Sequence, residues 1–142
     1  MASQQTLVQE WFTSPTQKFA VVGASSNRTK FGNKVLRWYI ENGYTAVPVN
    51  PKEPTIESLS CVQNLSSLPG NASEYNVSII TPPSITKSVL EEAHKNGIRR
   101  VWLQPQVDSP EALAYAKEVG LEIIASGPCV LVDGIPNRKA KL

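Results

Sequence analysis

The chain has 142 residues and a formal net charge of +2, which suits a single domain and does not favour a nucleic-acid-binding surface. No apolar run reaches the roughly 20 residues that a membrane-spanning helix needs, and the N-terminus lacks the order of a secretory signal, so we expect a cytoplasmic protein. Cys61, Cys129 and the single histidine, His94, are too few and too far apart in sequence to suggest a protein-built metal site.

The first half of the sequence alternates helical and extended patterns. Apolar spacing, glycines and prolines predict, in order, a short N-terminal helix at residues 4–13, a strand at 19–22, a helix at 31–42 and a strand at 45–50. Residues 52–70 are rich in Pro, Ser, Glu and Asn. We interpret them as a loop with one short turn near residues 65–68.

The second half continues the same alternation. Short apolar runs predict strands at residues 77–80, 101–103 and 121–125. Between the first two strands, Ser84 can cap a helix that runs to residue 96. Between the last two, Ser109 and Pro110 have the pattern of a capped helix start, and this helix is predicted to end at residue 119.

Three predicted helices end in a glycine that an apolar strand follows at once. These joints lie at residues 42–50, 96–104 and 119–127. Continuous apolar runs are typical of parallel strands that are covered on both faces. The sequence therefore predicts an α/β fold in a single domain over residues 1–142: a Rossmann-like, doubly wound parallel sheet of five strands in the order 3-2-1-4-5, with helices on both faces.

Ligands of doubly wound sheets bind at the carboxyl ends of the strands. In this sequence small, polar and proline residues, with one lysine, follow four of the predicted strands. They are the candidate ligand-binding residues Gly23, Ala24, Ser25, Ser26, Asn50, Pro51, Lys52, Thr81, Pro82, Pro83 and Gln104. We expect these four segments to lie along one edge of the sheet.

The stretch from residue 18 to residue 32 has the pattern of a phosphate-binding loop. A buried strand leads into Gly23, and Gly32 opens the next helix, whose N-terminal N–H groups and dipole attract anions. Arg28 and Lys30 add positive charge to the loop, although each is equally compatible with a solvated loop cation. We therefore expect the phosphates of a nucleotide-containing ligand at this loop.

The loop differs from the Gly-x-Gly-x-x-Gly fingerprint of NAD-binding sheets. Ser25 stands at the second glycine position, and Gly32 is too far along the chain to complete the fingerprint. The second strand is followed by Lys52, where NAD-binding proteins carry an acid for the ribose hydroxyls. A lysine favours a phosphate over a bare ribose diol, so NAD is disfavoured and NADP stays an alternative ligand.

A resemblance to a known family rests on an ordered set of motifs. The set comprises Gly23-Ala24-Ser25, the Lys30/Gly32 pair, residues 43–51, Thr81-Pro82-Pro83, residues 101–104 and Cys129. Together these motifs are similar to those of the small stand-alone CoA-binding proteins, whose fold resembles the CoA-binding domain of the succinyl-CoA synthetase alpha subunit. The resemblance implies that the ligand is coenzyme A.

The resemblance also implies where the parts of CoA would lie. Residues 23–26 would take the phosphate-bearing part, and residues 50–52 would lie near the adenosine and its 3′-phosphate. Pro82, Pro83 and Gln104 would line the path of the pantetheine arm. Arg28, Lys30 and Lys52 would then match the charges of the diphosphate and the 3′-phosphate.

No residue pattern assigns a reaction to this sequence. It shows no acid–base pair and no nucleophile beside a base, so we expect a regulatory module that binds CoA or an acyl-CoA without chemistry of its own. Two alternatives stay open: an NADP- or nucleotide-binding regulatory protein, and a small thiol-dependent enzyme or carrier that uses Cys129. A homodimer or a separate protein partner is compatible with all three.

Residues 136–142 read as a basic tail that ends in Ala140-Lys141-Leu142. This tripeptide resembles the Ser-Lys-Leu address that a receptor reads for import into peroxisomes. The sequence therefore leaves the peroxisomal matrix as an alternative to the cytoplasm, beside the plainer interpretation of a solvated basic tail.

Overall fold

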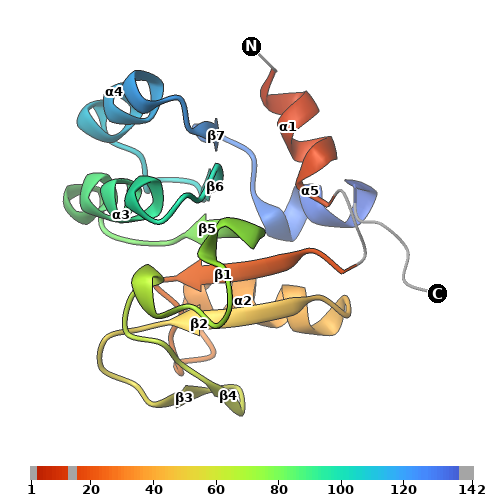
Figure 1. Cartoon of the computed structure of the whole chain (residues 1–142). Helices are drawn as coiled ribbons and strands as arrows, with labels where there is room; N and C mark the ends of the chain where they lie inside the picture. Colours follow the sequence, from red (N-terminus) through yellow and green to blue (C-terminus); the bar gives the residue numbers. More distant parts are fainter. Residues whose placement is uncertain (1–2, 13–15, 138–142) are drawn as a thin grey trace.

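The computed structural model describes residues 3–12 and 16–137. A five-stranded sheet forms the centre of the chain, and all of its neighbouring strands run parallel (Figure 1). From one edge to the other its strands are β2 (Thr45–Val49), β1 (Lys18–Val22), β5 (Tyr75–Ile79), β6 (Arg100–Leu103) and β7 (Glu122–Ile124). The Rossmann-like, doubly wound α/β class that the sequence predicts is confirmed.

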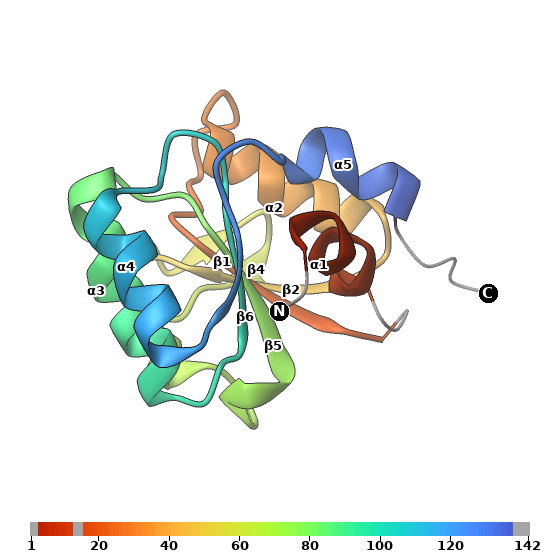
Figure 2. The same cartoon turned by 90° about the horizontal axis from the view of Figure 1, so that it is seen from above.

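Helices cover both faces of this sheet (Figure 2). One face carries α1 (Gln4–Trp11), α2 (Phe31–Glu41) and α5 (Val130–Asn137), and the other carries α3 (Pro83–Lys95) and α4 (Pro110–Val119). The connection from β2 to β5 holds a short hairpin, β3 (Thr55–Ile56) and β4 (Leu59–Ser60), and two 3₁₀ turns, η1 (Leu65–Ser67) and η2 (Ala72–Glu74). None of the described helices is both long enough and apolar enough to cross a bilayer.

The strand order differs from the expected one in the position of a single strand. Counted along the chain, the five long strands lie in the order 2-1-3-4-5, because β5 pairs with β1 and not with β2. Pro48 gives the physical reason: its carbonyl faces the outer edge of β2, where it accepts from the N–H of Val62, and proline has no N–H to add on that side. A strand interrupted in this way belongs at an edge, and among the described residues a single bridge at Val62 extends it.

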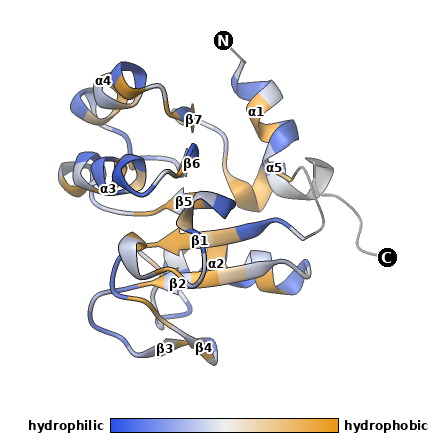
Figure 3. Cartoon of the chain, viewed as in Figure 1, coloured by the Kyte–Doolittle hydropathy of each residue, from blue (hydrophilic) through white to orange (hydrophobic). Residues whose placement is uncertain are grey.

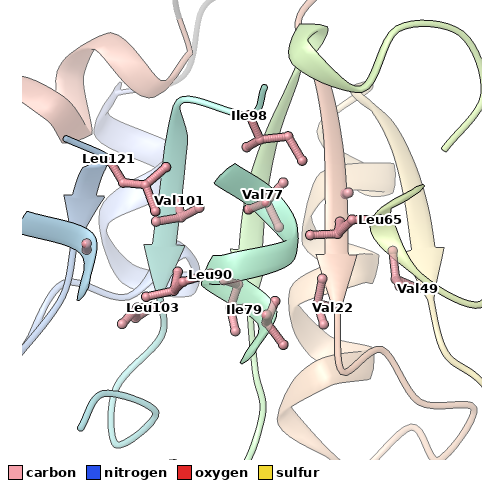
Figure 4. Close-up of a cluster of buried hydrophobic side chains, with 14 of the residues drawn as sticks. Val22, Val49, Leu65, Val77, Ile79, Leu90, Ile98, Val101, Leu103 and Leu121 are labelled. Atoms are coloured by element: carbon pink, nitrogen blue, oxygen red, sulfur yellow. The ribbon is translucent and has the colours of Figure 1, made fainter. Parts of the chain in front are cut away.

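Four of the five strands contribute to two hydrophobic cores because successive side chains point to opposite faces, whereas β5 has its apolar residues in one of them. Ala20 and Val22 join the core under α3 and α4, whose members Ile79, Leu90 and Leu103 are shown in Figure 4. The neighbouring residues of β1 join an aromatic core under α1 and α2, made largely of Trp11, Phe12, Phe19, Trp38, Tyr39, Tyr44 and Trp102. The hydrophobic colour follows β1 and β2, whereas the helices show polar residues on their outer surfaces (Figure 3).

All four predicted helices occur, with changes at their ends. Ser109 caps α4 as expected, its hydroxyl accepting from Ala112 N at 3.2 Å. The expected cap at Ser84 is wrong, because α3 already begins at Pro83, whose missing N–H costs nothing in the first turn. The N-terminal helix, expected to reach residue 13, ends at Trp11.

The chain beyond β7 contains a helix that the sequence does not predict. Helix α5 takes in the first residues of the expected basic tail at 136–142, and its Gly134 and Pro136 resemble breakers in the sequence. Gly134 is nevertheless required, because a Cβ there would lie 2.4 Å from the indole of Trp38 on α2. The tripeptide Ala140-Lys141-Leu142 lies outside the described residues.

Candidate functional site

The carboxyl ends of β1 and β5 meet at Gly23. This residue has a φ of +91°, and a Cβ added to it would lie 1.8 Å from the carbonyl oxygen of Ile80. A Cβ at Gly32 would lie 2.1 Å from the carbonyl oxygen of Gly23. Both glycines are therefore needed for the backbone to fold tightly between two strand ends and the start of α2.

Local hydrogen bonds fix the loop between these glycines, which we call the glycine loop (residues 23–30). Ser25 Oγ accepts from Asn27 N at 3.1 Å, and Asn27 Oδ1 accepts from Thr29 N at 3.0 Å. The buried Asn33 of α2 donates from Nδ2 to the carbonyl of Ser25 at 2.8 Å. Asn33 is absent from the predicted site, although a polar residue in the first turn of a glycine-opened helix is the signal that could have found it.

The end of β2 is tied to the glycine loop by Asn50. Its Nδ2 donates to the carbonyl of Ala24 at 2.9 Å, and its Oδ1 accepts from the backbone N–H groups of Lys52 (2.7 Å) and Glu53 (3.0 Å). The expectation that residues 23–26 and 50–52 lie together is met. The side-chain oxygen and nitrogen of Asn50, however, form hydrogen bonds within the protein, so its role in the site is to hold the end of β2 against the glycine loop.

Two carboxylates from a later segment of the chain contact the glycine loop and the start of α2. Glu53 Oε2 accepts from Ser26 N at 3.1 Å. Glu57 Oε2 accepts from Asn33 Nδ2 at 3.1 Å and lies 3.4 Å from Arg28 Nε. Neither Glu53 nor Glu57 is among the predicted site residues. The turn of the hairpin that carries Glu57 has no glycine and no Asn-Gly pair, which are the usual sequence signals of a hairpin.

The three cations of the site differ in their surroundings. Arg28 is largely exposed but paired with Glu57. Lys30 is the N-cap residue of α2, and its side chain caps none of the helix N–H groups. The ammonium groups of Lys30 and Lys52 are exposed, and within the described part of the chain neither has a recorded ion pair or hydrogen bond. Two unpaired positive charges therefore flank the loop.

The segment after β5 lies beside the glycine loop, because Gly23 contacts the carbonyl of Ile80. Thr81 Oγ1 lies 2.9 Å from Oγ1 of the buried Thr86, which also donates to the carbonyl of Val107 at 2.7 Å. Pro82 is the N-cap residue of α3 and Pro83 its first residue, and both are exposed. These prolines therefore present a fixed apolar surface at the same edge of the sheet.

Gln104 and Cys129 meet at the start of α5. Gln104 is 1% exposed, and its Oε1 accepts from Val130 N at 3.0 Å, while its buried Nε2 has no hydrogen-bond partner among the described residues. Cys129 is half-buried, and its N–H donates to Asp133 Oδ2 at 2.8 Å. Gln104 thus caps a helix, and the sequence predicts neither this cap nor the contact with the Cys129–Val130 peptide.

The described residues include no group of three or more His, Cys, Asp or Glu that could hold a metal ion. His94 lies on α3 with its ring 6.4 Å from that of Tyr115 on α4. A cavity of about 540 Å³ lies along β7 between α1 and α4, and its lining is mainly apolar, with Leu7, Leu121 and Ile123 among the residues. It is separate from the glycine loop and contains none of the candidate binding residues.

Comparison with known proteins connects this edge to a family. The sequence matches the CoA binding domain over residues 17–134. The chain belongs to this family. The matched range includes every candidate binding residue and Cys129, and it leaves out all of α1 and the last residues of the chain. The resemblance to stand-alone CoA-binding proteins is confirmed.

Solved structures show the same fold. A conserved hypothetical protein from Pyrococcus furiosus is 32% identical with a TM-score of 0.76, and the match covers 82% of this chain and 98% of that chain. A hypothetical protein from Pyrococcus horikoshii is 29% identical with a TM-score of 0.82, covering 93% and 89%. A dinucleotide-forming acetyl-coenzyme A synthetase from Ca. Korarchaeum cryptofilum is 22% identical with a TM-score of 0.69, over 83% of this chain but 27% of its own, so this likeness is one of fold.

Membership in the CoA binding domain family does not assign individual residues. The structure brings together the glycine loop, residues 50–52 and the segment after β5, while Gln104 is buried behind them at the start of α5. None of the comparisons supports NADP as the ligand. This edge of the sheet therefore presents the glycine loop and the start of α2, two lysines that have no ion pair among the described residues, and an exposed apolar proline surface.

Proposed function

We propose that this chain binds coenzyme A at the carboxyl edge of its sheet and acts as a ligand-binding module without a reaction of its own. The observation that carries the proposal is a CoA binding domain whose glycine loop lies between two unpaired cations, Lys30 and Lys52. A cradle of backbone N–H groups at a helix start suits phosphate, and lysines on both walls suit a ligand with more than one phosphate.

In this proposal, the two sides of the site bind different parts of the ligand. Lys30 and the N-terminus of α2 face the diphosphate, whereas Lys52, after β2, faces the adenosine side and its 3′-phosphate. Pro82 and Pro83 offer apolar surface to the pantetheine arm. Each charge-assisted hydrogen bond contributes on the order of 1.5–3 kcal/mol, so losing one lowers affinity by roughly tenfold or more.

Isothermal titration of lysine variants tests this assignment. Lys52→Ala should weaken CoA while leaving dephospho-CoA nearly unchanged, and Lys30→Ala should weaken both, because both carry the diphosphate. Lys117→Ala on α4 removes the same charge far from this edge and serves as the control. Unchanged CoA affinity in both site variants rejects the assignment, and a panel with NADP, NAD and ATP shows whether another nucleotide binds more tightly.

A second candidate function is a thiol carrier that uses Cys129. The observation that favours it is the buried amide nitrogen of Gln104, which has no hydrogen-bond partner in the described part of the chain, on a side chain that contacts the Cys129–Val130 peptide. In this function the Cys129 thiolate attacks CoA disulfide, forms a Cys129–S–S–CoA bond and releases one CoA thiolate. Mass spectrometry of the protein with CoA disulfide should find the adduct on Cys129, and Cys129→Ser should abolish it while CoA binding persists.

A further inference from the structure

The places where the glycine loop would receive an anion already hold two carboxylates of the same chain. Glu53 Oε2 accepts from the loop N–H of Ser26 at 3.1 Å, and Asn50 Nδ2 lies 3.4 Å from the same oxygen. Glu57 accepts a hydrogen bond from Asn33 Nδ2 at 3.1 Å, and both of its carboxylate oxygens lie 3.4 Å from nitrogens of Arg28. Each contact is one that a phosphate oxygen could make in place of a carboxylate oxygen.

Both acids belong to one short element, which we call the acidic hairpin (residues 53–60). Its strands β3 and β4 are two residues each, and Glu57 and Ser58 form the turn with φ values of +50° and +66°. Non-glycine residues rarely adopt this conformation. Buried Ile56 anchors the hairpin in the aromatic core, so the carboxylates can leave the loop by side-chain rotation while the hairpin stays attached.

The charges around the glycine loop explain why these contacts form. Arg28, Lys30 and Lys52 lie around the loop, and Arg37 on α2 extends the cluster through Asn33 Oδ1 at 2.6 Å and the carbonyl of Arg28 at 3.0 Å. A loop with this surplus of positive charge attracts whatever anion is within reach. The acidic hairpin supplies two.

We propose that Glu53 and Glu57 are internal competitors that hold the glycine loop closed to anions and set the affinity and selectivity of the site. The inference rests on the proposed CoA-binding function and concerns its regulation. CoA phosphates replace the two carboxylates, which frees Arg28 and the Ser26 N–H for the ligand. Because each phosphate only replaces contacts that a carboxylate already makes, every displacement lowers the apparent affinity, and a ligand that displaces both carboxylates loses more affinity than one that displaces a single carboxylate.

Glutamine substitutions test the competition. Glu53→Gln, Glu57→Gln and the double variant keep the side-chain shape and one amide oxygen but remove the negative charges. The double variant should bind CoA on the order of tenfold more tightly than the unmodified chain, with each single variant intermediate. Glu118→Gln changes net charge equally on the exposed surface of α4 and should stay within about twofold.

Adenosine monophosphate, used in the same titrations, tests selectivity. The double variant should prefer CoA over this monophosphate by a larger factor than the unmodified chain does, because CoA displaces both carboxylates whereas a single phosphate displaces one. An equal preference in both proteins contradicts the selectivity part of the proposal.

The outcomes separate this inference from the proposed function. If the unmodified chain binds CoA and the charge-removing variants bind it equally or more weakly, the competition is rejected and CoA binding stands. If only the double variant binds CoA, the competition is supported in its strongest form. If none of the proteins binds CoA, both are rejected. Thermal unfolding of each variant confirms that it is folded, and either single variant suffices if the double variant is not.

Discussion

The backbone of Gly23 lies against the carbonyl oxygen of Ile80, so that a Cβ at residue 23 would fall 1.8 Å from that oxygen. No shift of a flexible side chain relieves such a contact, because both partners are backbone. Gly23→Ala should therefore lower the free energy of unfolding by roughly 3 kcal/mol or more and weaken CoA binding with it. Urea denaturation followed by far-UV circular dichroism measures the first effect, and titration of the folded fraction measures the second.

Gly120 offers the matched control for this variant. Its φ of +77° is similarly left-handed, but a Cβ there would meet no atom within 4 Å. Gly120→Ala should cost only about 1–2 kcal/mol, the strain of the backbone conformation itself. Similar losses in the two variants would show that conformation alone, and not the contact with Ile80, requires glycine at residue 23.

A second prediction concerns the hydroxyl of Tyr39, which joins α1, α2 and β5. It accepts from Trp11 Nε1 at 2.9 Å and lies 2.7 Å from Ser78 Oγ, all in the buried aromatic core. Tyr39→Phe leaves the indole N–H and the serine hydroxyl buried without this partner, so we expect a loss of about 1–3 kcal/mol in urea unfolding. Tyr115→Phe, at a half-buried tyrosine of α4, should change stability by less than half of that.

The same hydroxyl predicts how stability changes in alkali. Burial raises the pKa of Tyr39 well above its ordinary value of 10.0, although the hydrogen bonds with Ser78 and Trp11 act in the opposite direction. Since the unfolded chain releases this proton at lower pH than the folded chain, stability is full below pH 10 and falls as the pH rises above it. Burial also raises the pKa of Tyr75, so Tyr39→Phe should reduce the slope above pH 10 without removing it.

The residues that were predictable are those whose role follows from local pattern. The apolar runs and helix-ending glycines predict the five strands. Because parallel strands end at the same edge of a sheet, they also predict that residues 23–26 and 50–52 lie at one edge. The missed features depend on contacts across the chain. Glu57 reaches Asn33 because it lies in the turn of a hairpin that has no signal in the sequence. Gly134 lies within α5 because the indole of Trp38 occupies the place where a Cβ would be. Pro48 is a local signal that its strand lies at an edge of the sheet, and the expected strand order places that strand inside the sheet.

Cys61 provides a reporter of Glu53. Burial raises the pKa of the Cys61 thiol, and the negative charge of Glu53 raises it further. Glu53→Gln removes the second cause, so the pKa should fall and more thiolate should be present near pH 8. Alkylation of Cys61 by iodoacetamide, followed by mass spectrometry, should become faster in this variant.

Cys129 is the internal control for that measurement, because it lies at the start of α5 and its rate should not change. An equal acceleration at both cysteines would point to general loosening of the fold. No change at Cys61 would mean that the carboxylate of Glu53 has no electrostatic effect on this thiol, which would weaken the case that it stays near the loop.

The last prediction follows from the cap that Gln104 gives to α5. Its Oε1 accepts from Val130 N at 3.0 Å across the end of β6, so Gln104→Leu leaves an N–H of the first turn without a partner. A lost helix cap costs about 1 kcal/mol, which corresponds to roughly fivefold faster amide exchange where opening is local. Hydrogen exchange should quicken in residues 130–134 and stay unchanged in α4. Ser109→Ala, which uncaps α4, should give the reverse pattern, whereas faster exchange in both helices of either variant would mean that the two caps act on global stability and not on their own helices.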